Sequence, residues 1–253
     1  MVGREILLAC GGMGRALMLL AEAVLFIPHI VRARSRHEVL NQMFIGGIKS
    51  LPVITVVSMF TGMILALQTG IELRRFSQEV FIGSAVMMSM LREMGPFMTG
   101  IILAASVGAA FAAQMGTMVV SEEIAALEVM AISPVRYLVM PRLVAMAIMT
   151  PILSFYGCLM GVIGGAIVGK TQLGVHWTAY IENATTYVTL KDIYVGLFKA
   201  FVFGVIIAIV SCYEGFQTTN GAVGVGESTR RSVVVSFLAI LITGFFITRI
   251  FYI

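Results

Sequence analysis

Five stretches of the sequence are long and apolar enough to cross a lipid bilayer as helices. A membrane-spanning helix needs about 20 predominantly apolar residues, because it rises only about 1.5 Å per residue. The pattern therefore predicts an all-α integral membrane protein with five transmembrane helices. The stretches run from Leu51 to Gln68, Ile82 to Ala113, Leu143 to Val168, Tyr194 to Tyr213 and Ser232 to Phe251.

The composition excludes several other classes of protein. Charged residues make up 12% of the 253 residues and apolar residues 59%, whereas a soluble domain averages about 25% charged residues. The chain has too little charge to coat a water-facing surface, and its net charge of +4 is too diffuse for a nucleic-acid partner. The three cysteines and three histidines are scattered, so we expect no metal site.

The N-terminal segment differs from the five spans because its charges form a stripe. Arg4, Arg15 and Glu22 are separated by 11 and 7 residues, which places them within about 20° of one line on a helix. A narrow charged stripe beside a wide apolar face favours a helix that lies in the membrane interface. The alternative is a sixth span from Ala16 to Val31, which would contain Glu22 and Pro28.

The distribution of basic residues predicts the orientation of the chain. With five spans, ten Lys and Arg residues lie on the N-terminal side, six on the opposite side, and Arg92 within a span. Basic residues concentrate on the cytoplasmic side of membrane proteins. We therefore expect a cytoplasmic N-terminus and a C-terminus on the outer side.

The second stretch contains the most informative pair of charges, Arg92 and Glu93. At 32 residues it would measure about 48 Å as a helix, so we expect it to tilt, kink or break near Pro96. A charged side chain at the bilayer centre costs about 2.5–3.5 kcal/mol. The pair is therefore either a structural or interface-solvated ion pair, or a polar gate or head-group contact in a lipid cavity.

The first stretch supplies candidate apolar walls for such a cavity. If its helix continues beyond Gln68, four side chains fall roughly along one side. The predicted lipid-binding residues are these four together with the charged pair: Leu65, Gln68, Leu73, Phe76, Arg92 and Glu93.

A short amphipathic helix is predicted between the second and third spans. Ser121 is a suitable N-cap, the acidic residues that follow favour the positive end of a helix, and Pro134 would end it. An acidic start disfavours an anionic lipid surface, so we expect this helix to dock on a protein. Its candidate contact residues are Glu122, Glu123, Leu127, Glu128 and Met130.

Two glycine-rich segments invite a nucleotide-binding interpretation, but only the first matches a complete pattern. Residues 164–171, GGAIVGKT, fit the phosphate-binding P-loop pattern, but that loop requires a preceding strand, whereas here an apolar helix runs into it. Residues 221–229, GAVGVGEST, are expected to form a flexible cytoplasmic loop. Small residues recur every four positions from Gly100 to Gly116 and from Gly157 to Gly169, which indicates close helix packing.

The segment LREMGP, residues 91–96, together with AAQMGTMVVSEEIAALEVMAISPVRYLVMPR, residues 112–142, closely resembles the MlaE/YrbE family of permeases in ABC-type phospholipid transporters. The likeness extends from about Leu51 to the C-terminus. It implies one permease domain over residues 1–253, with interfacial helices in 1–49, a five-span bundle in 50–253 and a coupling helix at about 121–132.

The resemblance also implies the partners and the role. These are a second copy of the permease, two cytoplasmic ABC ATPase subunits that bind the ATP, a periplasmic ring of MCE-domain proteins, and a small cytoplasmic accessory subunit. Such a permease needs no cofactor and is not itself an enzyme. It would move phospholipid between the inner and outer membranes through a cavity at the centre of the homodimer, and so maintain outer-membrane lipid asymmetry.

Two departures from the family pattern stand out. Gln114 occupies a position where the family commonly has Glu, and Ala131 replaces a frequent Gly, a change expected to cost little within a helix. Two rival functions remain open. An intramembrane lipid-modifying enzyme would need a nucleophile with its base or a metal-binding cluster, and a small-solute channel would need several intramembrane charges, whereas the sequence suggests a single pair.

Overall fold

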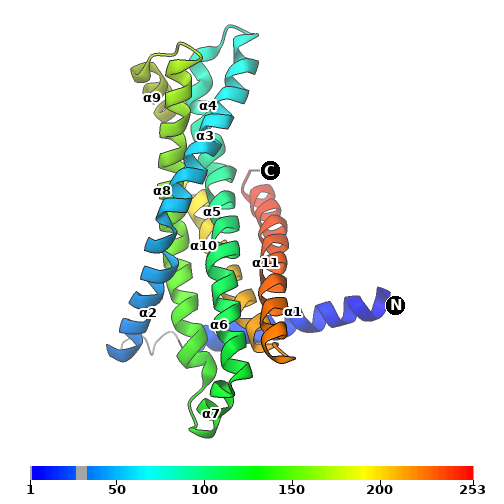
Figure 1. Ribbon diagram of the computed structural model, residues 1–253. Coiled ribbons are helices and arrows are strands. Elements are labelled where there is room, and N and C mark those ends of the chain that lie inside the picture. Colours follow the sequence, from blue (N-terminus) through cyan, green and yellow to red (C-terminus); the bar gives the residue numbers. More distant parts are fainter. Residues whose placement is uncertain (1, 27–32, 253) are drawn as a thin grey trace. The chain divides into compact units, whose positions relative to one another are not determined.

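The computed structural model describes residues 2–26 and 33–252, and the side chains of 12, 14–26 and 36–252. All regular structure in these residues is helical (Figure 1). The chain forms two compact units, each built from three segments. Unit 1 contains Met1–Gly46, Leu103–Ala147 and Gly204–Ala239, and unit 2 contains Gly47–Ile102, Ile148–Phe203 and Ile240–Ile253.

The prediction of five spans is confirmed for the described residues. Each predicted stretch lies inside a helical segment long and apolar enough to cross a membrane. These segments are Arg36–Arg74, Glu79–Val120, Val135–Thr171, Leu190–Phe216 and Gly221–Tyr252.

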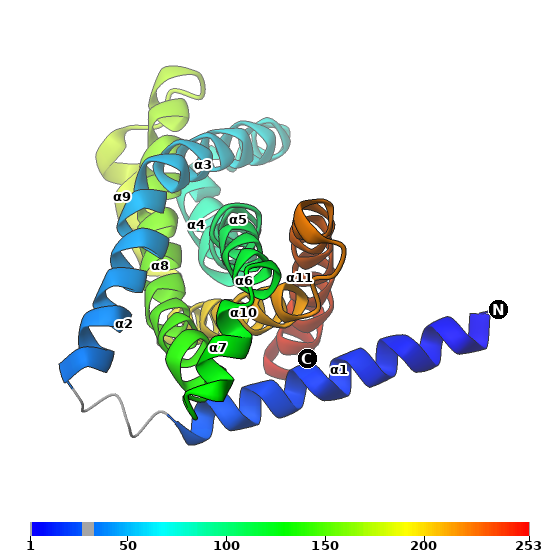
Figure 2. The same ribbon diagram turned by 60° about the horizontal axis from the view of Figure 1, so that its bottom comes forward.

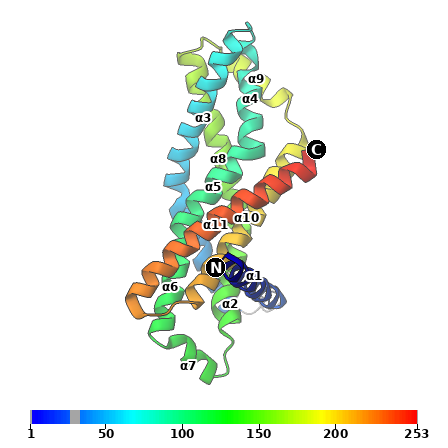
Figure 3. The same ribbon diagram turned by 90° about the vertical axis from the view of Figure 1, so that its right-hand side faces the viewer.

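Unit 2 contains helix α3 (Leu51–Arg74), the turn η3 (Glu79–Phe81), helix α4 (Ile82–Ser89) and helix α9 (Trp177–Thr186), together with most of α8 (Met140–Thr171). Their ribbons run together in Figures 1 and 3. A side chain at Gly62 would overlap the carbonyl oxygen of Gly161, so the backbones of α3 and α8 touch. The predicted close packing around the glycines of α8 is therefore confirmed.

Among the described residues, Tyr180 of α9 is the largest fully buried side chain. It lies in the core cluster of unit 2 with Ile82, Val86 and Ala166. Its hydroxyl has no hydrogen-bond partner among the described residues, and burial raises the pKa of this hydroxyl above its ordinary value. The core of unit 2 thus extends beyond the apolar spans into the short helix α9.

The second predicted span stays helical through Pro96 instead of breaking there. Helix α4 passes through a π-helical turn, η4 (Met90–Met94), into α5 (Gly95–Leu103). A second π turn, η5 (Ala104–Gly108), leads into α6 (Ala109–Val120). The wider π turn accommodates the proline because the hydrogen-bond register shifts by one residue before it.

Unit 1 holds the N-terminal helices α1 (Val2–Leu25) and α2 (Ala33–Gly46). Helix α1 contacts the π turn η6 (Val135–Val139), which opens α8 (Figure 2). The interfacial position of α1 stays a prediction, and Arg4 of its charged stripe lies outside the described side chains. The alternative sixth span, Ala16 to Val31, includes residues 27–31, which also lie outside the described residues.

Residues 221–229 form no loop, which corrects the sequence-based expectation. They are the first turns of α11 (Gly221–Tyr252), a continuous helix in Figure 3. Gly221 adopts a positive φ of 62°, which only glycine does without strain. A side chain at Gly224 would overlap the carbonyl oxygen of Thr219, so these glycines allow a tight turn to pack on the helix that follows.

Candidate functional site

Arg92 and Glu93 lie on the π turn η4 of unit 2. Pro96 has no backbone N–H, so the carbonyl oxygen of Arg92 lacks its usual donor four residues later. The N–H of Gly95 bonds to the carbonyl oxygen of Met90 instead. The proline and the π turn therefore leave the carbonyl oxygen of Arg92, a strong hydrogen-bond acceptor, without a backbone donor.

Lys199 of helix α10 (Leu190–Phe216) donates a hydrogen bond to this carbonyl oxygen. Its Nζ donates to the carbonyl oxygen of Arg92 at 2.7 Å and to Oε1 of Glu93 at 2.6 Å. The hydroxyl of Thr248 on α11 lies 2.7 Å from Nζ and donates to Glu93 at 2.8 Å. Lys199 is buried to 1% exposure, so its charge is matched by three oxygen atoms rather than by water.

Arg92 pairs with a second carboxylate on α10. Its Nε donates to Oδ1 of Asp192 at 2.7 Å, and Tyr252 of α11 donates its hydroxyl proton to the same oxygen at 3.0 Å. The other oxygen, Oδ2, accepts from the backbone N–H and the hydroxyl of Thr189. Thr189 and Asp192 thus cap the start of α10, which holds the buried carboxylate in place.

Close approach of two backbones makes the cluster possible. A side chain at Gly196 would overlap the carbonyl oxygen of Leu91, so α10 can press directly on the π turn. We name the resulting group the polar cluster of unit 2. It consists of Arg92, Glu93, Thr189, Asp192, Lys199, Thr248 and Tyr252.

The prediction that Arg92 and Glu93 form a single, isolated pair of charges is therefore wrong, because two further charged residues join them. Asp192 and Lys199 had a signal in the sequence, because seven residues make nearly two helical turns and place both on one face. The argument against a channel rested on a lone pair, and the structure removes that premise. All four charges are nevertheless partnered within the chain, which is unlike an open ion path.

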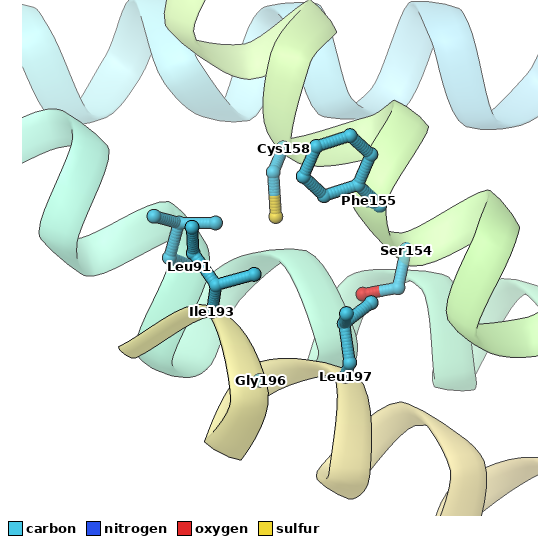
Figure 4. Close-up of a pocket in the computed structure, with 7 residues that line it drawn as sticks. All are labelled: Leu91, Ser154, Phe155, Cys158, Ile193, Gly196 and Leu197. Atoms are coloured by element: carbon cyan, nitrogen blue, oxygen red, sulfur yellow. The ribbon is translucent and has the colours of Figure 1, made fainter. Parts of the chain in front are cut away.

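The polar cluster lies next to a small apolar cavity whose side chains converge in Figure 4. Its volume is about 10 Å³, enough for about one water molecule and far too small for an acyl chain. It holds no nucleophile with an adjacent base, and the described residues contain no group of three potential metal ligands. The lining residues are Leu91, Ser154, Phe155, Cys158, Ile193, Gly196 and Leu197.

The four predicted wall residues of α3 and the loop after it divide into two kinds. Leu65 and Leu73 are partly buried and pack on the core cluster of unit 2, whereas Gln68 is exposed and Phe76 is 73% exposed. The bonds of Arg92 and Glu93 go to α10 and α11. The structure therefore does not gather the six predicted lipid-binding residues into one pocket of a single chain.

The predicted coupling segment lies in unit 1 as helix α7 (Glu123–Val129). It is shorter than the range 121–132, and Glu122 precedes it in the left-handed conformation, without a side-chain cap. The hydroxyl of Ser121 lies instead within hydrogen-bonding distance of two acceptors, the carbonyl oxygen of Thr117 and the carboxylate of Glu123. Ser121 therefore stabilises the end of α6 and does not serve as the N-cap of α7.

Comparison with known proteins identifies the family. The family model described as Permease MlaE matches residues 39–250. The chain belongs to the MlaE permease family. This membership and the five membrane-length helices among the described residues make it a multi-pass inner-membrane permease.

Named relatives agree with this assignment. The Intermembrane phospholipid transport system permease protein MlaE of Haemophilus influenzae is 32% identical over 99% of this chain and 96% of its own length. A probable ABC transporter permease protein of Rickettsia typhi is 42% identical over 85% of this chain and 83% of its own. The chloroplast protein TRIGALACTOSYLDIACYLGLYCEROL 1 of Arabidopsis thaliana is 35% identical over 84% of this chain and 61% of its own.

The first departure of this MlaE permease from its family lies beside a buried arginine. The amide oxygen of Gln114 accepts from Arg142 at 3.1 Å. Arg142 also donates to the carbonyl oxygen of Leu138 and lies over the ring of Phe111. Arg142 is only 5% exposed, and its Nε has no partner among the described residues. A neutral amide therefore faces a buried cation at the position where the resemblance led us to expect a carboxylate.

The second departure falls outside the helix that was expected to contain it. Helix α7 ends at Val129, and Ala131 has a positive φ of 56°. This left-handed conformation after a helix favours glycine, because a Cβ atom clashes with the following carbonyl there. The expectation that Ala131 costs little is therefore wrong, and Ala131 strains the turn that follows α7.

Proposed function

We propose that this permease is the transmembrane subunit of an ATP-driven transporter that moves phospholipid between the inner and outer membranes. Two copies would enclose the lipid cavity, and two cytoplasmic ABC ATPase subunits would bind the ATP and supply the force. A periplasmic ring of MCE-domain proteins and a small cytoplasmic accessory subunit would complete the assembly, which would maintain outer-membrane lipid asymmetry. The Haemophilus relative is named for intermembrane phospholipid transport, which supports this proposal.

The observation that carries the proposal is the surface of α7. Glu122, Glu123 and Glu128 are exposed there, and two apolar side chains beside them, Val129 and Met130, are 89% and 61% exposed. Apolar groups rimmed by acidic ones are typical of a surface that another protein covers. Leu127 is partly buried, so it anchors the helix while the other residues face outward.

The polar cluster would form the rigid part of the lipid path. Its internal bonds fix the π turn of α4 to α10 and α11, while Arg92 and Glu93 keep 36% and 43% of their side-chain surface exposed. A lipid head group could contact these exposed parts without breaking the bonds that hold the cluster together. Acyl chains would lie against the apolar faces outside the cluster, including the one near Phe76.

Assembly tests the coupling role of α7. The double variant Glu122→Lys/Glu123→Lys, expressed with the ATPase subunits, is expected to retain at most about a tenth of the wild-type amount of ATPase on purification, because two interfacial charges are reversed. The matched control is Glu72→Lys/Glu182→Lys, which reverses two exposed acids of unit 2. Equal ATPase recovery from both variants would contradict the coupling role.

Lipid transfer tests the other half of the proposal. The purified assembly should move fluorescent phospholipid between vesicles only with ATP, and Glu93→Gln should slow this transfer more than it reduces assembly. Transfer by the isolated chain without ATPase subunits would favour an intramembrane enzyme or a passive channel. Normal transfer by Glu93→Gln would remove Glu93 from the lipid path.

A further inference from the structure

Two basic side chains, those of Arg92 and Lys191, lie against the aromatic ring of Tyr252. The guanidinium carbon of Arg92 lies 4.8 Å from the ring centre, and Nζ of Lys191 lies 5.3 Å from the same centre. Both distances are within cation–π range. The two positive charges are therefore at most about 10 Å apart, the sum of these distances.

Only one of these charges is neutralised by the chain. Asp192 pairs with Arg92, and Glu93 pairs with Lys199, whereas Lys191 forms no ion pair among the described residues. The polar cluster together with Lys191 thus contains three basic and two acidic side chains. The surplus charge is at its exposed edge, since Lys191 is exposed and Lys199 is buried.

Lys191 also stands where a lysine is unfavourable for helix stability. It is the second residue of α10, and the positive end of the helix dipole repels a cation there. Its neighbour Asp192 follows the ordinary preference for an acid in this turn. Among the described residues, the chain compensates this cost through the cation–π contact with Tyr252 alone, and a residue that breaks a local rule is a candidate for function.

Arg92 has donors to spare for a ligand. Its bond to Asp192 uses Nε, and its two terminal nitrogens bond to no residue that the structure describes. Guanidinium groups recognise phosphate through such paired donors. An anion at the exposed edge would also relieve the repulsion between Arg92 and Lys191.

We propose that Arg92, Lys191 and Tyr252 form a binding site for the phosphodiester of an anionic phospholipid head group. Arg92 binds the phosphate, Tyr252 holds both cations in place, and Lys191 adds the charge that favours a lipid of net negative charge over a zwitterionic one. This inference rests on the proposed function, because it names the head-group class that the permease prefers.

Competitive lipid binding tests the site. The full chain in detergent is offered equal amounts of phosphatidylglycerol and phosphatidylethanolamine, and the retained lipids are counted by native mass spectrometry. The wild-type chain should retain more phosphatidylglycerol, and Lys191→Met should reduce this ratio about fivefold, the effect of one lysine near an anionic surface. Lys170→Met, which removes an exposed lysine at the end of α8, should leave the ratio unchanged.

Two further arms distinguish a lipid head-group site from a site for free inorganic phosphate and from a purely structural role of Lys191. Lys191→Glu should lower the ratio below that of Lys191→Met, while the thermal stability of both variants should equal or slightly exceed that of the wild type. Inorganic phosphate at millimolar concentration should not displace phosphatidylglycerol, because the lipid also binds through its acyl chains. Displacement by inorganic phosphate would identify a site for the free anion and overturn the proposal.

The outcomes also distinguish this inference from the proposed function. Lipid retention with a ratio that Lys191→Met does not change would overturn the head-group site and leave phospholipid transport standing. An equal loss of preference in Lys170→Met would overturn it as well, since any surface charge would then suffice. A wild-type chain that retains no phospholipid of either kind would overturn both.

Discussion

Lys199 in unit 2 and Arg142 in unit 1 are both buried basic residues, yet the chain satisfies them in different ways. Lys199 bonds to a carboxylate, a hydroxyl and a free carbonyl oxygen. Arg142 bonds to a carbonyl oxygen and to the neutral amide of Gln114, and its Nε is left without a partner among the described residues. Substitutions around Lys199 should therefore only lower the free energy of unfolding, whereas a substitution near Arg142 can raise it.

The largest effect is expected for Lys199→Met. Methionine fills a similar volume but leaves the carbonyl oxygen of Arg92 without a donor and Glu93 without its cation. Losing all three hydrogen bonds of a buried ammonium group should lower the free energy of unfolding by about 3 kcal/mol, measured by reversible unfolding of the full chain in detergent micelles. Lys170→Met at an exposed site should change it by less than about 0.5 kcal/mol. A loss for Lys199→Met below about 1 kcal/mol would refute a structural role for this bond network.

Asp192→Asn should have the next largest effect. Asparagine keeps the shape and part of the cap at Thr189, but it removes the charge that neutralises Arg92. We expect a loss of about 2 kcal/mol, smaller than for Lys199→Met because the asparagine side chain can still accept a hydrogen bond from Arg92 or Thr189. Glu182→Gln, at an exposed site on α9, provides the control. The Arg92–Asp192 pair would prove unimportant if both variants melted at the same temperature.

In unit 1 we expect a substitution to stabilise the protein instead of destabilising it. Gln114→Glu should raise the free energy of unfolding by about 1 kcal/mol, because Arg142 would gain a charge-assisted bond. The gain should vanish when Arg142 is replaced by Met, which a double-mutant cycle measures. Gln172→Glu, an exposed control in the turn just after α8, should have no such effect. A gain that survives the loss of Arg142 would show that the two residues are not coupled.

The smallest effect, again a stabilisation, is expected for Ala131→Gly. Glycine removes the strain of a positive φ but makes the unfolded chain more flexible, so the net gain should be about 0.5–1 kcal/mol. Ala125→Gly is a matched control, because Ala125 is exposed within the regular turns of α7. It should instead cost about 1 kcal/mol. Equal destabilisation by both changes would mean that the turn after α7 is not strained.

The sequence predicted the five spans because apolar length is a local property that needs no knowledge of the fold. It also singled out Arg92 and Glu93, since adjacent charges within an apolar run are conspicuous. It missed Asp192 and Lys199 because they fall near the start of an apolar run, where charges are common and attract no notice. Sequence-based reasoning also placed Ala131 in a helix and residues 221–229 in a loop. In the structure Ala131 has a left-handed backbone conformation outside α7, and residues 221–229 are helical.

By itself, the amino-acid sequence determined the class of this protein, its helical spans and the family to which it belongs. Tertiary structure alone decided which charges meet. Arg92 and Asp192 are 100 residues apart in the chain, and Glu93 and Lys199 are separated by 106. These pairs form because a proline frees one carbonyl oxygen and a glycine lets α10 approach it, and packing between distant segments cannot be derived from the composition of either segment alone.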